Sequence, residues 1–306
     1  FLGSNNMWEF VNVTKNYTSK YYPAATAGWS PPGLGARVAL GGLSIRASAI
    51  APTATHPEQQ SAFYAEERLA TGQIFGRRDD SSGRFELTVS IERSTSRVLT
   101  TCVWHPNATS AAASWSENAT ATIEVTTWVA AGRPTNASVI GQHGTIGVLS
   151  RVAVRREALA GSPLVITGAL ATTLLPGGGA RLVATAAHPA INDTEGSEVR
   201  MTLRVQAHVS FSLATTYADS VLTDHPMAAV ASAAAALSEA EIGSAARIEQ
   251  QSASWWQSFW GNASISLPKH PNVEYVWYTA NAMGARDSST RGDVAAPGLF
   301  GPMITS

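Results

Sequence analysis

The sequence of 306 residues predicts a mainly β protein with a helical C-terminal part: a large antiparallel β-sandwich followed by a linker helix and a second helix. Two observations support this prediction, one for the strands and one for the helical part. Short runs rich in β-branched and aromatic residues recur up to residue 213, and Gly, Pro and Asn clusters separate them. From Met227 to Gln257 the sequence is instead rich in alanine without internal proline, which favours a helix.

Composition excludes several classes of function. Charged residues make up only 14% of the chain and the net charge is -1, with no run of Lys or Arg, so nucleic acid is not an expected partner. No apolar run reaches about 18 residues, so we expect no membrane span. The seven histidines lack metal-ligand spacing, and Gly177 to Gly179 lack the lysine of a phosphate loop. We therefore expect neither a metal nor another cofactor.

The strands are expected in the following order. Residues 1–35 are interpreted as a loop, and Gly41-Gly42 as the turn of a hairpin between residues 37–40 and 43–46. Residues 61–78 pair around Ala70 to Gly72, and residues 85–92 alternate so that one face is buried and the other is wet. Further strands are predicted at residues 97–104, 121–130, 145–156, 164–173, 180–187 and 198–213. The single cysteine, Cys102, lies in one of these apolar runs and is expected to be a buried, inert thiol.

Two helices follow. The first has apolar residues at helical spacing, namely Val230, Leu237, Ile248, Trp255 and Phe259. The second begins at Pro271, ends near Arg286, and is expected to bury Val273, Val276, Trp277, Ala280 and Met283. The predicted domains are 1–224 (β-sandwich), 225–268 (helical linker with an aromatic hinge) and 269–306 (the start of a helical domain that is cut off).

The hinge is the stretch Trp255-Trp256-Gln257-Ser258-Phe259-Trp260. Rings of this size bury roughly 150–250 Å² each when packed, so an aromatic core without any chemistry is the simplest interpretation. Glu241, Glu249 and Glu274 lie on or beside the linker, and we expect a solvated role for each.

Seven Asn-X-Ser/Thr sequons indicate the compartment, since they are glycosylated only in a secretory pathway. They are Asn12, Asn16, Asn107, Asn118, Asn136, Asn192 and Asn262. A secreted or extracellular location with covalent N-glycans follows; the alternative is unused sequons in a Ser/Thr-rich chain. The chain begins with Phe1 and shows no signal peptide, which is expected of a mature chain or an internal fragment.

The order of these features resembles the six-hairpin glycosidases, the (α/α)6-barrel glycoside hydrolases, and among them the alpha-L-fucosidase-like family 95 and its relatives. The residues that carry the resemblance are Trp255, Trp256, Phe259, Trp260, Ser264, Ile265, Leu267, Pro268, Tyr278 and the loop from Pro297 to Pro302. Relatives often have His where this chain has Ser252, and an acidic residue where it has Asn5-Asn6.

The resemblance implies that residues 1–224 are a β-supersandwich missing its first strands, and that residues 269–306 are the first elements of a truncated (α/α)6 barrel. It also implies that the catalytic carboxylates lie outside this chain, so no catalytic residue is assigned. Candidates for lining a sugar site are Asn5, Asn6, Trp8, Pro297, Gly298, Leu299 and Phe300. Plain structural turns are the alternative for both segments. Two functions stay open: part of a secreted glycoside hydrolase acting on polysaccharide or glycan, and a non-catalytic glycoprotein that binds carbohydrate or self-associates as a surface or filament building block.

Overall fold

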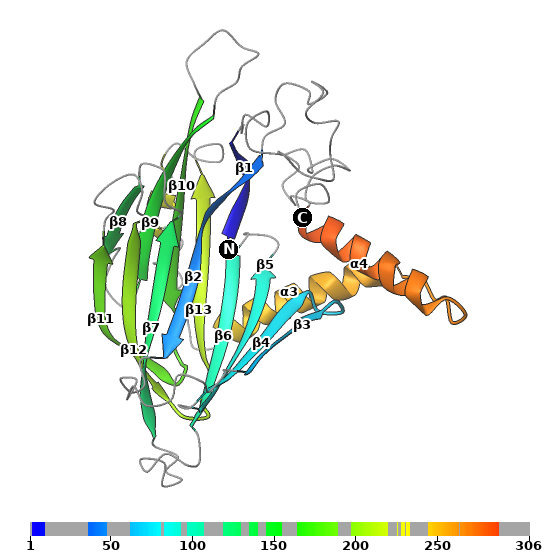
Figure 1. Cartoon of the computed structure of the whole chain (residues 1–306), viewed down its shortest axis with the longest axis horizontal. Helices are drawn as coiled ribbons and strands as arrows, with labels where there is room; N and C mark the ends of the chain where they lie inside the picture. Colours follow the sequence, from blue (N-terminus) through cyan, green and yellow to red (C-terminus); the bar gives the residue numbers. More distant parts are fainter. Residues whose placement is uncertain are drawn as a thin grey trace.

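The computed structural model describes residues 2–9, 36–47, 62–80, 83–92, 97–106, 119–129, 135–139, 145–154, 164–188, 197–219, 225, 228–229, 231–232, 244–262 and 264–287. They form two β-sheets packed face to face, with two helices at the C-terminal side (Figure 1). The predicted fold class, an antiparallel β-sandwich followed by helices, is confirmed. In the described part of the chain, neither helix has the length and apolar character needed to cross a membrane.

Every strand pairing within the two sheets is antiparallel. The first sheet has the strand order β1 (Leu2–Glu9), β2 (Ala36–Ala47), β7 (Thr120–Val129), β12 (Glu198–Gln206) and β11 (Ala180–His188). The second has the order β3 (Ala62–Arg68), β4 (Gln73–Asp80), β5 (Gly83–Glu92), β6 (Arg97–Pro106), β13 (Phe211–Asp219), β10 (Leu164–Leu174), β9 (Thr145–Val154) and β8 (Thr135–Val139).

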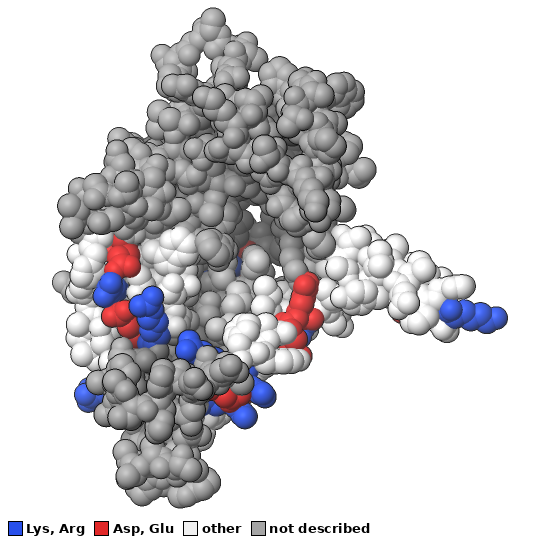
Figure 2. Space-filling model, in the orientation of Figure 1, with Lys and Arg blue, Asp and Glu red and all other residues white. Residues whose placement is uncertain are grey.

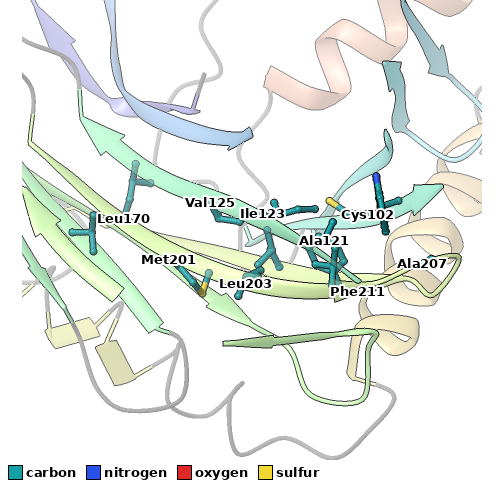
Figure 3. Packing of buried hydrophobic residues seen from close by; sticks show 13 residues of the cluster. Cys102, Ala121, Ile123, Val125, Leu170, Met201, Leu203, Ala207 and Phe211 are labelled. Atoms are coloured by element: carbon teal, nitrogen blue, oxygen red, sulfur yellow. The ribbon is translucent and has the colours of Figure 1, made fainter. Parts of the chain in front are cut away.

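The core lies between the two sheets and follows from strict alternation along the strands. On β12, Val199, Met201, Leu203 and Val205 all point inward and are fully buried. They meet Cys102 and Phe211 of the second sheet, among other apolar residues (Figure 3). Burial of Cys102 is thus confirmed, and burial raises the pKa of its thiol.

Two predictions about the first sheet are wrong. Residues 2–9 form a strand and not a loop, although the register slips between Gly3 and Trp8. Gly41-Gly42 does not turn the chain, because β2 continues straight through both residues. Gly42 makes room for the indole of Trp128 on β7, since an added Cβ at Gly42 would stand 2.8 Å from Trp128 Cζ2.

The predicted strand over residues 198–213 is also wrong, because it is two strands in different sheets. The chain turns at Ala207 to Ser210, where His208 has a φ of 60°. A non-glycine residue with a positive φ is uncommon, and a sequence pattern gives no sign of it. The structure adds β8, which the sequence did not predict.

The helices are α3 (Ser244–Asn262) and α4 (Pro271–Asp287). α4 has the bounds expected from the sequence, with Pro271 in its first turn. α3 begins after Gly243, and residues 233–243 of the predicted first helix, including Leu237, lie outside the described residues, as does Val230. α3 lies against β5 and β6, whereas α4 extends away from the sandwich (Figure 1).

Candidate functional site

The candidate site is the junction at which α3 and α4 meet the second sheet. α3 packs on the outer face of that sheet, opposite the sandwich core. Its Ile248 is fully buried against Leu99 of β6 and Ala214 of β13. Leu99 and Ala214 point to the face opposite the one that carries the core residues Cys102 and Leu213, so both faces of the sheet are covered here.

Polar contacts fix α3 on this face. Ser252 is buried, and its hydroxyl donates to the carbonyl oxygen of Ile91 at 3.1 Å. Thr101 donates to Glu249 Oε1 at 3.0 Å in a partly buried position. The expectation of a solvated Glu249 is therefore wrong: its carboxylate accepts a hydrogen bond that ties the helix to β6. Glu241 lies outside the described residues.

The aromatic hinge forms one packed cluster. Trp255 stacks on Phe259 with ring centroids 5.4 Å apart and an angle of 10° between the planes. Trp256 meets Phe259 edge to face at 5.7 Å, and Phe259 meets Trp260 in the same way at 4.8 Å. Offset and edge-to-face contacts of this kind stabilise by about 0.5–1.5 kcal/mol each beyond the buried area.

The cluster holds the turn between β3 and β4 from one side. Trp256 is buried against Gly72, and the indole N–H of Trp260 donates to the carbonyl oxygen of Leu69 at 2.7 Å. Gly72 has a φ of 62°, a conformation that glycine adopts without steric cost. The aromatic side chains of the hinge therefore contact backbone atoms of the turn.

The other side of the cluster holds α4. Trp260 meets Tyr278 edge to face at 5.2 Å, and Trp256 shares a cluster with the fully buried Ala282. Along α3, Trp256 precedes Trp260, whereas along α4 the partner of Trp256, Ala282, follows Tyr278, so the two helices run antiparallel at this contact. Trp256 and Trp260 consequently both contact the sheet turn and the second helix.

Two hydrogen bonds shape the connection between the helices. Tyr278 donates from its hydroxyl to the carbonyl oxygen of Ile265 at 2.8 Å. Glu274, in the first turn of α4, accepts the backbone N–H of Leu267 at 2.6 Å. Glu274 is partly buried and is not simply solvated, contrary to expectation. Its position near the helix N-terminus also suits a negative charge.

The buried face of α4 differs from the predicted one. Val273 and Val276 are 56% and 64% exposed, and Ala280 is exposed as well. The partly buried Trp277 is as expected, but Tyr278 and Ala282 complete the contact with α3. The side chain of Met283 lies outside the described residues. Apolar residues were assigned to the core side by type alone, whereas α3 covers only one face.

The assignment of seven residues to a sugar site stays a prediction, because their side chains lie outside the described part of the structure. Asn5, Asn6 and Trp8 are in β1, and both asparagines fall in the register slip between Gly3 and Trp8. Nothing of their side chains is described. Pro297, Gly298, Leu299 and Phe300 lie outside the described residues.

Two of the seven sequons fall on described elements. Asn136 is in β8, at the edge of the second sheet. Asn262 is exposed at the end of α3, where its side-chain amide donates to the carbonyl oxygen of Ser258 at 3.0 Å. The sequons outside the described residues are Asn12, Asn16, Asn107, Asn118 and Asn192.

No family model matches the chain, and no curated protein matches it. Among solved structures, it is similar to a protein described as a kojibiose phosphorylase from the human microbiome, with a TM-score of 0.43, 10% identity and 74% of this chain covered. A bacterial glucoamylase in complex with acarbose gives a TM-score of 0.38, 9% identity and 66% coverage. A GH92 family glycosyl hydrolase gives a TM-score of 0.40, 12% identity and 72% coverage.

This chain covers 29% of the length of each of these three structures. The similarity at these identities and scores does not assign the chain to a family.

Proposed function

We propose that this chain is the β-sandwich and barrel entrance of a secreted protein that acts on glycosidic bonds of a polysaccharide or glycan, with its catalytic carboxylates outside the 306 residues. The observation that supports the proposal is the place of the motif from Trp255 to Pro268. The stretch that resembles six-hairpin glycosidases is the stretch that joins the sheet turn to α4 through Trp260. The domain limits 1–224, 225–268 and 269–306 are part of this proposal.

The uncovered face of α4 supports the same assignment. Val273, Tyr275 and Val276 are each more than half exposed, so the first turns of the helix carry an exposed apolar strip on the side away from α3. The visible surface of α4 shows almost no charged atoms (Figure 2). A helix that is apolar on two sides is typical of a position between neighbouring helices. In an α/α barrel the next helices would cover this strip.

The first experiment is the intact mass of the natural protein before and after enzymatic removal of N-glycans. We expect a polypeptide much larger than 32.1 kDa that loses mass on deglycosylation, with the exposed Asn262 among the modified sites. A deglycosylated mass of 32.1 kDa would exclude the barrel, and an unchanged mass would exclude the glycans.

A matched pair of substitutions tests the barrel contact. Val276→Asp places a charge on the exposed strip, whereas Asn272→Asp places one on an exposed polar site of the same helix. We expect Val276→Asp to lower the melting temperature and the release of reducing sugar of the natural protein, and to leave the 306-residue chain unaffected. Equal effects of the two substitutions in the natural protein would contradict the proposal.

A second function is favoured by a different observation. β3 is the last strand of its sheet, so one of its edges has no strand partner among the described residues. Phe63 on β3 is 73% exposed and Ile74 on β4 is 45% exposed, which puts apolar side chains beside this edge. Edges of this kind support strand pairing between molecules. The alternative is therefore a non-catalytic glycoprotein that self-associates as a building block.

Light scattering on the glycosylated protein separates the two functions. A building block would form dimers or larger assemblies that Phe63→Lys breaks up, without releasing sugar from any polysaccharide. A monomer that stays monomeric at high concentration would contradict the alternative and leave the enzyme proposal standing.

A further inference from the structure

Two histidines that are distant in the sequence meet at one end of the second sheet. Nδ1 of His105 lies 2.9 Å from Nδ1 of His208, and the ring centroids are 5.1 Å apart. Two neutral imidazoles can share one proton at this distance, with one ring as donor and the other as acceptor. Two protonated rings would repel each other. The pair therefore presents two nitrogen atoms to one small site.

The fold brings the pair together at a conformational cost. His105 is near the end of β6, and His208 is in the turn between β12 and β13. The backbone N–H of His208 donates to the carbonyl oxygen of Trp104 at 2.8 Å, which places the turn beside the end of β6. His208 adopts a φ of 60°. Outliers of this kind cost of order 1–3 kcal/mol and cluster at binding sites and switches.

A carboxylate faces the outer nitrogen of His105. Glu86 Oε2, on the neighbouring strand β5, lies 3.7 Å from His105 Nε2. Its negative charge favours the tautomer that carries the proton on Nε2 and leaves the lone pair of Nδ1 free to bind. A ligating histidine whose second nitrogen faces a carboxylate is the usual arrangement around protein-bound metals. Arg84, opposite His105 on β5, is held by Asp79 at 2.8 Å.

We propose that Nδ1 of His105 and Nδ1 of His208 bind one divalent transition-metal ion, with Glu86 as the orienting partner of His105. The site joins β6 of one sheet to the turn that leads from the other, so the ion acts as a clip between the sheets. No group of three or more ligand side chains gathers among the described residues, so water fills the other coordination positions. The His105 side chain is 34% exposed, which leaves the site open to solvent.

The spacing favours particular metals. Two nitrogen ligands at about 2.0–2.1 Å from an ion are about 2.9 Å apart at a right angle and about 3.3–3.4 Å apart at a tetrahedral angle. The observed 2.9 Å fits neighbouring positions in the tetragonal or square-planar geometry of Cu²⁺ or Ni²⁺. Affinity for nitrogen ligands also increases in the order Ni²⁺ then Cu²⁺. We therefore expect Cu²⁺ to bind more tightly than Ni²⁺ or Zn²⁺.

The experiment titrates the protein with Cu²⁺, Ni²⁺ and Zn²⁺ by calorimetry and records the electron paramagnetic resonance spectrum of the Cu²⁺ form. We expect one Cu²⁺ per chain with two coupled nitrogens, and a higher melting temperature because the ion binds the folded state. His208→Asn keeps a residue that tolerates a positive φ and removes the imidazole, so the fold is retained. It should weaken Cu²⁺ binding more than about tenfold, and Glu86→Gln should weaken it about tenfold.

His188→Ala is the matched control, because His188 is an exposed histidine on another strand, β11. The proposal predicts unchanged Cu²⁺ affinity for this variant. It is overturned if His105→Ala and His208→Asn bind Cu²⁺ as the parent does, or if His188→Ala loses binding to the same extent. A single coupled nitrogen in the spectrum would overturn it too.

Discussion

The indole of Trp256 lies so close to Gly72 that no side chain fits between them: a Cβ built on Gly72 would stand 1.8 Å from Trp256 Nε1. Gly72 also has a φ of 62°. The turn between β3 and β4 can therefore pack against α3 only because a glycine occupies this position. The contact joins residues 184 positions apart, and it sets how α3 lies on the sheet.

Gly72→Ala is expected to destabilise the protein by about 2–5 kcal/mol, because alanine would have to adopt the left-handed backbone conformation and its Cβ would clash with the indole of Trp256. Urea unfolding measures the change. Gly261→Ala, in α3 where nothing lies within 4 Å of an added Cβ, is the control and should be neutral or stabilising by up to about 1 kcal/mol. Equal unfolding midpoints for the two variants would contradict the packing described here.

Tyr278→Phe removes the hydroxyl that donates to Ile265 and keeps the ring. We expect a loss of about 1 kcal/mol and faster amide exchange in the connection from Ser264 to Pro268, because the carbonyl oxygen loses its partner. Tyr275→Phe is the control on the same helix, where the side chain is 66% exposed. It should change stability by less than about 0.5 kcal/mol. The idea fails if both variants exchange alike.

Three buried threonines link the sheets inside the core. Thr127 of β7 donates to Thr172 of β10 at 2.7 Å, and Thr172 lies 3.1 Å from Thr215 of β13. Thr172→Val should cost about 1–3 kcal/mol in the free energy of unfolding, because it leaves two buried hydroxyls without this partner. Thr120→Val, at an exposed strand position, should have little effect. Replacing all three buried threonines by Val should cost less than three times the single change.

The carboxyl of Glu66 has a pKa below its ordinary value of 4.5, first because Tyr64 donates to it at 2.7 Å and then because Arg68 does. A lowered folded-state pKa stabilises the protein above the ordinary value, and this stabilisation is lost as the pH falls below about 4.5. Tyr64→Phe should raise the Glu66 pKa toward its ordinary value in a carboxyl NMR titration. Tyr275→Phe should leave it in place; an unchanged pKa in Tyr64→Phe would contradict the assignment.

Cys102 should resist thiol reagents in the native protein and react fully in denaturant. It is completely buried, and burial raises its pKa, so little thiolate is present or accessible. Because it is the single cysteine of the sequence, the labelling rate reports on opening of the core. Rapid labelling without denaturant would contradict the packing around Phe211.

Local patterns were sufficient for most elements and failed where a distant residue decides the conformation. The alternating strands and the limits of α4 follow from nearby residues alone. The two glycines of β2 were interpreted as a turn, because nothing near them in the sequence indicates that Trp128 packs against Gly42. In the same way, the valines of α4 were placed inside by their type, although α3 covers another face of the helix.

The candidate site shows the same division. The aromatic content of the hinge is visible in the sequence, but its contacts with Leu69 and Gly72 are not, because they depend on the fold of β3 and β4. The histidine pair could not be found from spacing, since His105 and His208 are 103 residues apart. The positive φ of His208 has no signature in the residue type beyond a modest preference of histidine for that conformation.

The strand order also determines how long one edge of β6 stays unpaired while the chain is being synthesised. β6 lies between β5, which is synthesised just before it, and β13, which is synthesised much later. Ser212 of β13, which contacts Thr101 of β6, follows it by 111 residues in the chain. At about 5–20 residues per second the ribosome needs roughly 6–22 s to deliver that partner. During this time the growing chain carries an open, apolar strand edge. Chaperone binding at β6, or pairing with another nascent chain, competes with correct folding in that interval.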